Sequence, residues 1–570
     1  MSVDCIIKNG RVYSVDMAGI VSRNEAVAIK DGIITAVGTD EDIGRLATID
    51  TKIIDAEGCS VMPGFSDAHL HATFSASAMF SCNLFEVVAD ETYNREKLIK
   101  EYQQKMKIYM ENHKEDKIIR GTGWNIGYFG TQLPTRHDLD EICPDKPMVL
   151  ESFCQHHLWV NTKAIEMSGI TKDTPTPRAG EVTREENGYP VGIFSEFTAL
   201  AMIKENLKGY DFSIEEYKET LRIYQREFAN KYGVTLIFDA YCSENGREAY
   251  KELARNKELT IRVRGNYYAD PASDEVQFDK MINRKGKDKV EDLYDVNTVK
   301  FFIEGSGVDF YLNEPMNEEF LKAAGFPPDY TGKPFWSDEE INRYFTKLNK
   351  AGFQTHSHAM GDRAVKQTIN GCEYAANHSA KNMRNVIAHI MYAQEEDIDR
   401  MGKLNIMGCV QPTWMVQEPI TTAGLKYMFG EDRYLDFYPY KRLIDAGCIV
   451  SVGTDFPVTP PPDTFVEIEH ALRRSVTKGA RFYDEVYGNL ILGPKNNPTR
   501  DCVDLKDVIQ GLTINSAYQN FVEDITGSIE VGKSAELVVL DRNLEETEPS
   551  DIYMTNVRYT LFKGNVVYEA

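Results

Sequence analysis

The feature that most restricts the fold of this chain is a regular alternation of apolar runs and amphipathic stretches that begins near residue 212. Apolar runs lie at 59–71, 234–240, 260–269, 298–305, 352–359, 385–390, 405–412 and 448–455. Most are separated by helical segments such as 338–352, which is typical of a parallel sheet. Eight such strands predict an α/β fold, a (β/α)8 TIM barrel whose chemistry lies at the C-terminal strand ends.

The two ends of the chain have a different pattern. At 570 residues the chain exceeds the roughly 250 to 300 residues that one hydrophobic core serves. Short strands are predicted at both termini, with tight turns between them such as Asp31-Gly32 near the N-terminus. Short strands need a sheet of three or more strands to be stable. We therefore expect residues 1–60 and 520–570 to form one small β-sandwich domain, with the barrel at 61–519. Residues 80–210 lack the alternation and are predicted to form an inserted subdomain over the barrel mouth.

The charge of the chain restricts its partners. It has 88 acidic against 64 basic residues and a formal charge of −24, which argues against nucleic acid or an anionic membrane as partner. A small-molecule substrate is expected, and the sequence leaves open whether the chain forms a homodimer. The N-terminus lacks a secretory signal and no apolar run reaches about 18 residues, so we expect a cytoplasmic protein. Its 10 cysteines show no CxxC motif and are predicted to be mostly buried, reduced thiols.

Polar residues cluster at the predicted strand ends. In "PGFSDAHLH" two histidines stand two residues apart, so both face one side of a strand and can reach one metal ion. Taken singly, such residues are usually hydrogen-bonded structural groups, but their joint occurrence at four strand ends favours a divalent metal site, such as Zn²⁺. The strand-end residues are His69, His71, His356, His358, His389 and Asp455.

Several motifs carry a resemblance that runs almost end to end. They are "PGFSDAHLH", "THSHAMGDRAV", "NVIAHI", "SVGTDFPV" and "NSAYQNFVEDITGSIEVGKSAELVVLD". In order and spacing the chain resembles the metal-dependent amidohydrolase superfamily, in its amidohydrolase-3 or YtcJ-like branch, which includes N-substituted formamide deformylase. The branch usually has Asp at the position of Glu536, which we interpret as a surface-type change.

The resemblance implies a ligand set. His69 and His71 would bind one ion, His358 and His389 a second, and Asp455 is the carboxylate of the eighth strand. The expected cofactor is one or two divalent ions per chain, with Zn²⁺ preferred. His356 is then expected to line the pocket or to support a ligand.

The fourth strand offers two candidates for a bridge between the ions. Related amidohydrolases carry a lysine here that captures CO₂ as a carbamate, and Lys300 has this position. Burial would favour the neutral amine that this reaction needs. The alternatives are a Lys300 that is capped by a neighbouring acid, or Glu304 as the metal carboxylate.

Further residues are candidates for substrate binding. The segment "ESFCQHHLWVN" is similar to a branch segment that places His156 in the pocket or in support of the insertion. Trp124 and Trp414 either wall the substrate site or pack in the core. With Glu304 and His356 they complete the expected substrate-binding set.

The implied chemistry is hydrolysis of a C–N bond, of amide or N-formyl type, in a small molecule. A divalent ion activates water, and Asp455 serves as general base and then as general acid. The alternative is a catalytically silent metal-containing barrel that binds a metabolite or a protein partner.

Overall fold

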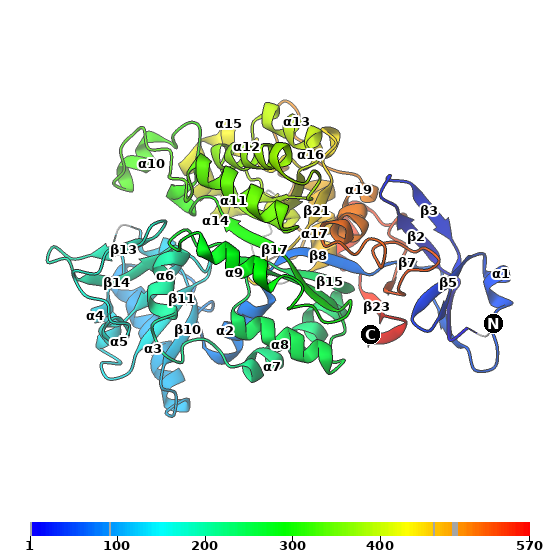
Figure 1. Cartoon of the computed structure of the whole chain (residues 1–570), viewed down its shortest axis with the longest axis horizontal. Coiled ribbons are helices and arrows are strands. Elements are labelled where there is room, and N and C mark those ends of the chain that lie inside the picture. The colour runs from blue at the N-terminus through cyan, green and yellow to red at the C-terminus, as the bar shows by residue number, and fades with distance from the viewer. Residues whose placement is uncertain (1–2, 90–92, 131, 460–461, 481–487) are drawn as a thin grey trace.

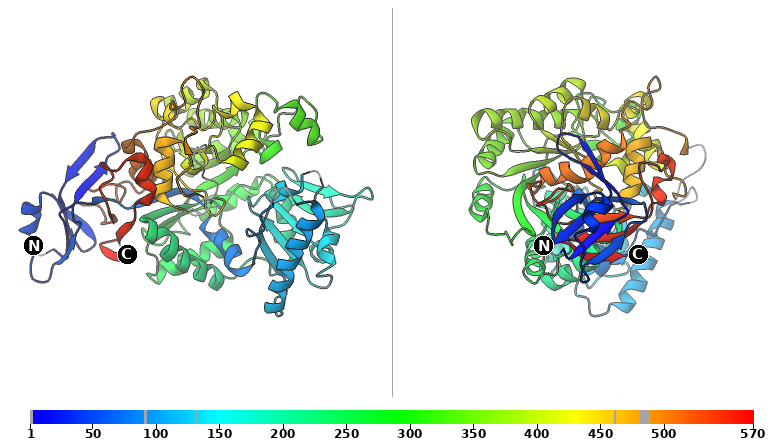
Figure 2. Two further views of the ribbon diagram at one scale, coloured as in Figure 1. Left: turned by 180° about the vertical axis from the view of Figure 1, so that it is seen from behind. Right: turned by 90° about the vertical axis from the view of Figure 1, so that its right-hand side faces the viewer.

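The computed structural model describes residues 3–89, 93–130, 132–459, 462–480 and 488–570. The molecule is elongated, with strands of both termini at one end, a barrel in the middle and the segment that follows the first barrel strand at the other end (Figures 1 and 2). In the described residues, no helix is both long and apolar enough to span a bilayer. All 10 cysteines are free thiols, most of them buried.

Eight parallel strands form the central sheet, and the predicted (β/α)8 barrel is confirmed. Neighbouring strands in this sheet follow the order of the chain. The strands are β8 (Phe65–Leu70), β15 (Val234–Asp239), β16 (Arg262–Tyr268), β17 (Tyr294–Phe302), β18 (Gln354–Ala359), β19 (Val386–His389), β20 (Met407–Val410) and β21 (Val450–Val452). Two backbone hydrogen bonds join the last strand end to the first. The amide of Asp455 donates to the carbonyl of His69 at 2.8 Å, and that of His71 to Phe456 at 2.7 Å.

Helices connect the strands and cover the outside of the barrel (Figure 1). Several begin with a capping box, in which Ser and Glu side chains satisfy free amides of the first turn. Ser213 with Glu216 starts one helix in this way, and Ser337 with Glu340 starts another. The main helices are α7 (Ile214–Tyr224), α8 (Glu244–Arg255), α9 (Val276–Arg284), α11 (Asp338–Lys350), α12 (Asp362–His378), α13 (Glu395–Lys403), α14 (Pro419–Phe429), α16 (Tyr440–Asp445), α17 (Thr464–Arg473) and α19 (Leu505–Gln510).

Strands from both termini pack as a two-layered sandwich. In the six-stranded sheet, the C-terminal β22 pairs antiparallel with the N-terminal β7. Buried side chains such as Ile7, Ile29, Leu537 and Leu561 fill the space between the layers. The four-stranded layer is β5 (Ile33–Gly38), β4 (Ala26–Lys30), β1 (Cys5–Lys8) and β6 (Lys52–Asp55); the other is β24 (Asn565–Glu569), β23 (Val557–Phe562), β22 (Leu537–Leu540), β7 (Ser60–Pro63), β2 (Arg11–Val15) and β3 (Val21–Asn24).

The run 59–71 therefore serves two sheets, because β7 belongs to the sandwich and β8 to the barrel. Gly64 stands between them. A Cβ there would lie 2.2 Å from Oγ1 of Thr235 on the next barrel strand. This close approach requires glycine and fixes the point where the chain passes from the sandwich to the barrel.

Glu536 links the sandwich to the barrel, and its interpretation as a surface-type change is wrong. Its side chain is buried, and a carboxylate oxygen lies 2.7 Å from Nη2 of Arg262, whose side chain is also buried. Arg262 further pairs with Asp292. Loss of one partner of a buried pair leaves an uncompensated charge and typically costs about 3 to 5 kcal/mol, so this position has a structural role.

The segment between β8 and β15 has a six-stranded sheet of its own. Helices cover it, and one core contains Tyr102, Trp124 and Trp159 while another contains Leu158 and Phe194. The strands are β13 (Glu181–Arg184), β14 (Pro190–Ser195), β12 (His157–Val160), β11 (Met148–Ser152), β10 (Ile119–Trp124) and β9 (Cys82–Asn83), and the helices are α2 (Ser75–Phe80), α3 (Arg95–Asn112), α4 (Arg136–Asp140), α5 (Thr162–Met167) and α6 (Phe197–Lys204).

Trp124 lies in this core and not at the substrate cavity. Its side chain is fully buried, and its indole N–H donates to the carbonyl of Leu150 at 2.9 Å. Of the two roles that the sequence left open for it, core packing is the one that the structure shows, and its place in the substrate-binding set is corrected.

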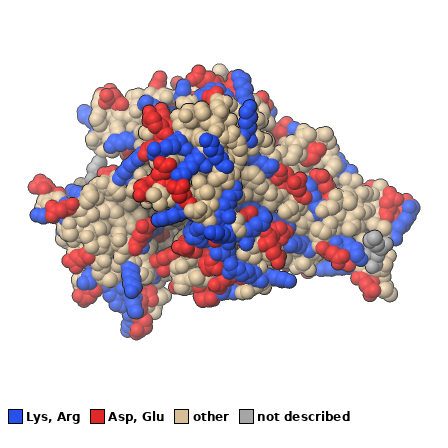
Figure 3. All heavy atoms as spheres, viewed as in Figure 1, with Lys and Arg blue, Asp and Glu red and all other residues tan. Residues whose placement is uncertain are grey.

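On the face shown in Figure 3, acidic and basic side chains are interspersed over the barrel and over the segment that follows β8. Neither sign forms a continuous field on this face.

Candidate metal centre

Three predicted ligands meet at the C-terminal end of the barrel. Ligand atoms of His69, His71 and Asp455 all lie within 4.8 Å of one another, and the three residues are buried. Oδ1 of Asp455 is 3.1 Å from Nε2 of His71 and 3.5 Å from Nε2 of His69. The backbone hydrogen bonds that close the barrel hold these residues together, because they join the ends of β8 and β21 directly.

His356 orients His69. Its Nε2 lies 2.7 Å from Nδ1 of His69, and its ring packs on Phe238 with centroids 4.7 Å apart. Since Nδ1 of His69 is engaged, Nε2 is the nitrogen that faces the centre. His356 is fully buried and lies behind the ligand rather than on the cavity wall, so the geometry favours its supporting role over substrate contact.

Lys300 approaches the same point from β17. Its Nζ lies 3.3 Å from Nε2 of His69, and its side chain is fully buried. Burial lowers its pKa to about 7, against a weaker opposing effect of Asp455. Within the described part of the chain, the polar contact of this amine is an imidazole and not an acidic side chain. A large share of the amine is neutral near pH 7. The carbamate itself stays a prediction.

His358 and His389 form the neighbouring pair, with ring centroids 4.7 Å apart. Nδ1 of His389 is 2.9 Å from Oε1 of Gln411, which leaves Nε2 toward the centre. Trp414 stacks on the His389 ring at 5.2 Å and 16°. Burial lowers the pKa of His389 to about 4 and that of His358 well below its usual value, so both rings are neutral.

The donor set fits a divalent metal. Nε2 of His358 is buried and has no hydrogen-bond partner among the described residues, a costly state for a polar atom unless a ligand satisfies it. Although burial alone would raise the pKa of Asp455, its hydrogen bond and charge interaction with His71 hold it below the usual value. Neutral imidazoles and an ionised carboxylate are the ligands that Zn²⁺ takes in proteins.

A family model described as "Amidohydrolase family" matches residues 52–568. The chain belongs to the amidohydrolase family. It is 24% identical to the putative amidohydrolase YtcJ of Bacillus subtilis, over 98% of both chains, and 24% identical to N-substituted formamide deformylase of Arthrobacter pascens, over 99% of this chain and 98% of that one.

The fold is shared with a solved structure, that of an uncharacterized metal-dependent hydrolase from Pyrococcus horikoshii OT3. The TM-score is 0.72 at 21% identity, and the match covers 99% of this chain and 100% of that one. Membership of the amidohydrolase family makes the protein a hydrolase.

In this amidohydrolase, Glu304 does not reach the centre. Oε1 accepts backbone hydrogen bonds from Met360 and from Gly361, the latter at 2.9 Å, and Oε2 accepts one from Tyr311. Its side chain is fully buried, which raises its pKa to about 8. The assignments of Glu304 as competing metal carboxylate and as substrate contact are therefore corrected: it braces the loop after β18 against the loop after β17.

The centre opens into a cavity of about 180 Å³. Besides the six proposed ligands, the residues that line it include His156, Phe197, Phe302, Phe310, Met360 and Trp414. The structure therefore brings His156 and Trp414 to the site, as the sequence suggested. Apart from the proposed ligands, the side chains that line this cavity are mostly apolar and can exclude bulk water, which is usual for small-molecule sites.

Glu196 is a site residue that the sequence analysis missed. Its Oε2 lies 2.7 Å from Nδ1 of His156, and its Oε1 accepts from the amide and the hydroxyl of Ser306 at 3.0 and 3.1 Å. Burial alone would lower the pKa of His156, but the Glu196 carboxylate raises it. Glu196 itself has φ 67° and ψ 151°, a strained conformation for a residue with a side chain.

Gln411, which orients His389, was also missed. It follows β20 directly, so its position at the C-terminal end of a barrel strand was the signal that could have identified it. Glu196 has no comparable sequence signal, because it meets Ser306 only through a contact between segments 110 residues apart.

Proposed function

We propose that this amidohydrolase cleaves the C–N bond of a small amide or N-formyl compound, with water as the nucleophile and one or two divalent ions, preferably Zn²⁺, as cofactor. The observation that carries the proposal is the convergence of His69, His71 and Asp455 within 4.8 Å at the barrel mouth. The names of YtcJ and of the formamide deformylase support the bond type. The proposed ligands are His69, His71, Lys300, His358, His389 and Asp455.

The chemistry follows from the side chains that surround the cavity. A bound divalent ion supplies Lewis acidity, which lowers the pKa of water and polarises a carbonyl group. Asp455 is ionised, so its carboxylate accepts the proton that water loses on attack. It returns this proton to the amine nitrogen as the C–N bond breaks, which gives a carboxylic acid and a free amine.

The apolar walls favour this transfer, because Phe197, Phe302 and Phe310 exclude competing water. His156 and Trp414 stand on the cavity wall and are proposed to contact the substrate. Glu196 fixes the orientation of His156.

The experiment is amine release from a panel of N-formyl and N-acyl amines by the metal-replete protein, with Asp455→Asn as the matched variant. The proposal expects release by wild type and its loss in the variant, at equal metal content. A catalytically silent barrel would bind metal and release no amine from any panel member. The ionised Asp455 among the proposed ligands favours the enzyme, because it can also accept a proton, which a structural metal site does not need.

A further inference from the structure

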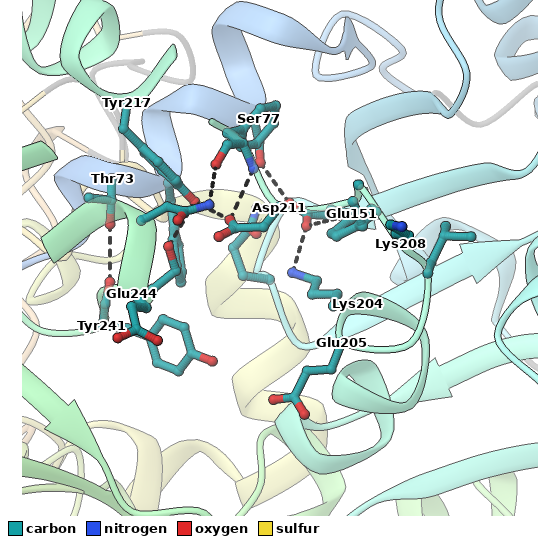
Figure 4. Close-up of a pocket in the computed structure, with 18 residues that line it drawn as sticks. Thr73, Ser77, Glu151, Lys204, Glu205, Lys208, Asp211, Tyr217, Tyr241 and Glu244 are labelled. Atoms are coloured by element: carbon teal, nitrogen blue, oxygen red, sulfur yellow. Dashed lines mark hydrogen bonds and ion pairs between the residues drawn. The ribbon is translucent and has the colours of Figure 1, made fainter. Parts of the chain in front are cut away.

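A second and larger cavity, of about 590 Å³, adjoins the metal centre. Figure 4 shows the residues that line this larger cavity. It lies between the loops after β8 and β15 and the segment after α6. The two cavities share Phe74 and Gln155 in their walls. Phe74 stacks on His71 at 4.8 Å on one side and contacts Tyr241 at 5.6 Å on the other. These two side chains therefore line both cavities at the place where the cavities adjoin.

The volumes assign different parts of a substrate to the two cavities. The metal cavity of about 180 Å³ is smaller than the roughly 300 to 1,000 Å³ of usual small-molecule sites. It leaves less room than the adjoining cavity for the part of a substrate beyond the reacting amide. For an N-formyl substrate the acyl side is a single hydrogen, so the bulk of the molecule is the substituent on nitrogen. The adjoining cavity has the volume to accept that substituent.

Charged groups of both signs line this cavity, and several neutralise one another. Nζ of Lys204 lies 2.6 Å from Oε1 of Glu151, and Glu244 pairs with Arg284 at 2.8 Å. Among the described residues, the lining charges that have no ion-pair partner are those of Lys208, Glu205 and Asp211. Two carboxylates against one ammonium leave an excess of negative charge.

Among the described residues, the hydrogen-bond donors to Asp211 are neutral groups. Its Oδ1 accepts from the hydroxyl of Tyr217 at 2.7 Å and from the amide of Phe212 at 3.0 Å. Figure 4 shows Asp211 near the middle of the view, with Tyr241 and Glu205 lower in the view on either side of the open space. Aromatic rings with nearby carboxylates are a setting that binds an alkylammonium group by charge and by cation–π attraction. The same setting repels an anion.

We propose that this cavity is the subsite for the nitrogen substituent of the substrate, and that it selects a substituent with a positive charge over a neutral or an anionic one. The inference rests on the proposed function, since it takes the scissile amide to lie at the metal centre. It adds a substrate class, which is amides of amines that carry a second, protonated amino group.

The test uses three formamides of matched length: monoformyl cadaverine, N-hexylformamide and N-formyl-ω-aminohexanoate. Their tails end in an ammonium, a methyl and a carboxylate group. Wild type is expected to show the highest kcat/KM for the ammonium tail and the lowest for the carboxylate tail. An ammonium tail that is no better than the methyl tail would overturn the inference.

Two further variants test the charge of the cavity, one by removing a negative side chain and the other by removing a positive one. Glu205→Gln should lower the ratio of kcat/KM for the ammonium tail to that for the methyl tail by about two- to fivefold, and Lys208→Gln should raise it, since single accessible charges have effects of this size. Glu569→Gln, on β24 in the sandwich, is the control and should leave the ratio unchanged. Unchanged ratios in both cavity variants would contradict the inference.

Failure of the proposed function gives a different result. If N-methylformamide and all three tailed formamides release no amine, the hydrolase proposal fails. The subsite is then tested by calorimetry of cadaverine binding to wild type and to the two cavity variants, without any formamide. Binding that weakens in Glu205→Gln and strengthens in Lys208→Gln supports it, and equal binding by all three proteins overturns it.

Discussion

Nζ of Lys300 lies 3.3 Å from Nε2 of His69, and both side chains are fully buried. An unmodified lysine, with a pKa of about 7, would offer the centre an amine that is partly protonated and carries no negative charge. A carbamate on Nζ would instead present an anionic group with two oxygens to the centre. The relationship between these two residues is therefore easier to reconcile with a modified lysine in the metal-loaded protein.

Lys300→Ala should lose both metal and activity, because the anionic bridge is removed. Acetate or propionate should restore part of each, since these acids can occupy the vacated space and supply the missing oxygens. Metal content and amine release, measured with and without added carboxylate, check this. Lys300→Arg is the matched variant that should not respond, because its guanidinium stays cationic and fills the space. Full metal content and turnover in Lys300→Ala would show that no carbamate on Lys300 holds the metal.

The metal-free protein should show a pH dependence of stability that comes from Lys300. Its pKa falls from 10.5 to about 7 on burial, so between these values the unfolded chain binds more protons than the folded one. Stability should rise with pH across this interval. Urea denaturation of apo wild type and apo Lys300→Met at about pH 7 and about pH 9.5 tests this. The variant should gain less stability than wild type, and an equal gain would mean that Lys300 is not buried as an amine.

Asp455→Asn should retain the fold and most of the metal but lose turnover. The amide is nearly the same size and cannot accept the proton from water. Loss of a proton-transfer group costs on the order of 10² to 10⁴ in rate. Amine release per metal-loaded chain is the measurement, with circular dichroism as the control for the fold. Turnover within a few-fold of wild type would show that another group moves the proton.

Glu196→Gln should lower the pKa of His156. In wild type the carboxylate raises this pKa against the effect of burial, and a neutral glutamine would leave burial unopposed. The imidazole resonances of His156, followed by NMR as the apo protein is titrated, report this directly. Those of His113, an exposed histidine at the end of α3, serve as the internal reference. An unchanged His156 titration would mean that Glu196 only braces the loop.

The barrel and most of the proposed ligands could be predicted because their signals are local. Strand periodicity places His69, His356 and His389 at strand ends, and parallel strands bring those ends to one edge. The preference for His358 over His356 as a ligand came from the resemblance, and the contact of 2.7 Å between Nε2 of His356 and Nδ1 of His69 favours it.

Other assignments failed because they depend on burial, which no local pattern reveals. Glu304 lies four residues after Lys300, just beyond the end of β17, yet backbone amides of two loops engage it. Trp124 was a candidate for the wall of the substrate site, and Glu536 was interpreted as a surface residue. Both are buried by segments distant in sequence. Glu196 was missed for the same reason, since its contacts arise only when the segment after β8 meets the barrel.

The most direct test of the central claim is amine release by the chelator-treated protein as Zn²⁺ is added back in known ratio to the chain. We expect no release without metal, a rise in proportion to bound metal that levels off near two ions per chain, and little recovery in a variant with His69→Ala and His71→Ala. A plateau near one ion would leave a mononuclear centre with Lys300 outside the ligand set. Release by the metal-free protein, or none at full metal loading, would contradict the account.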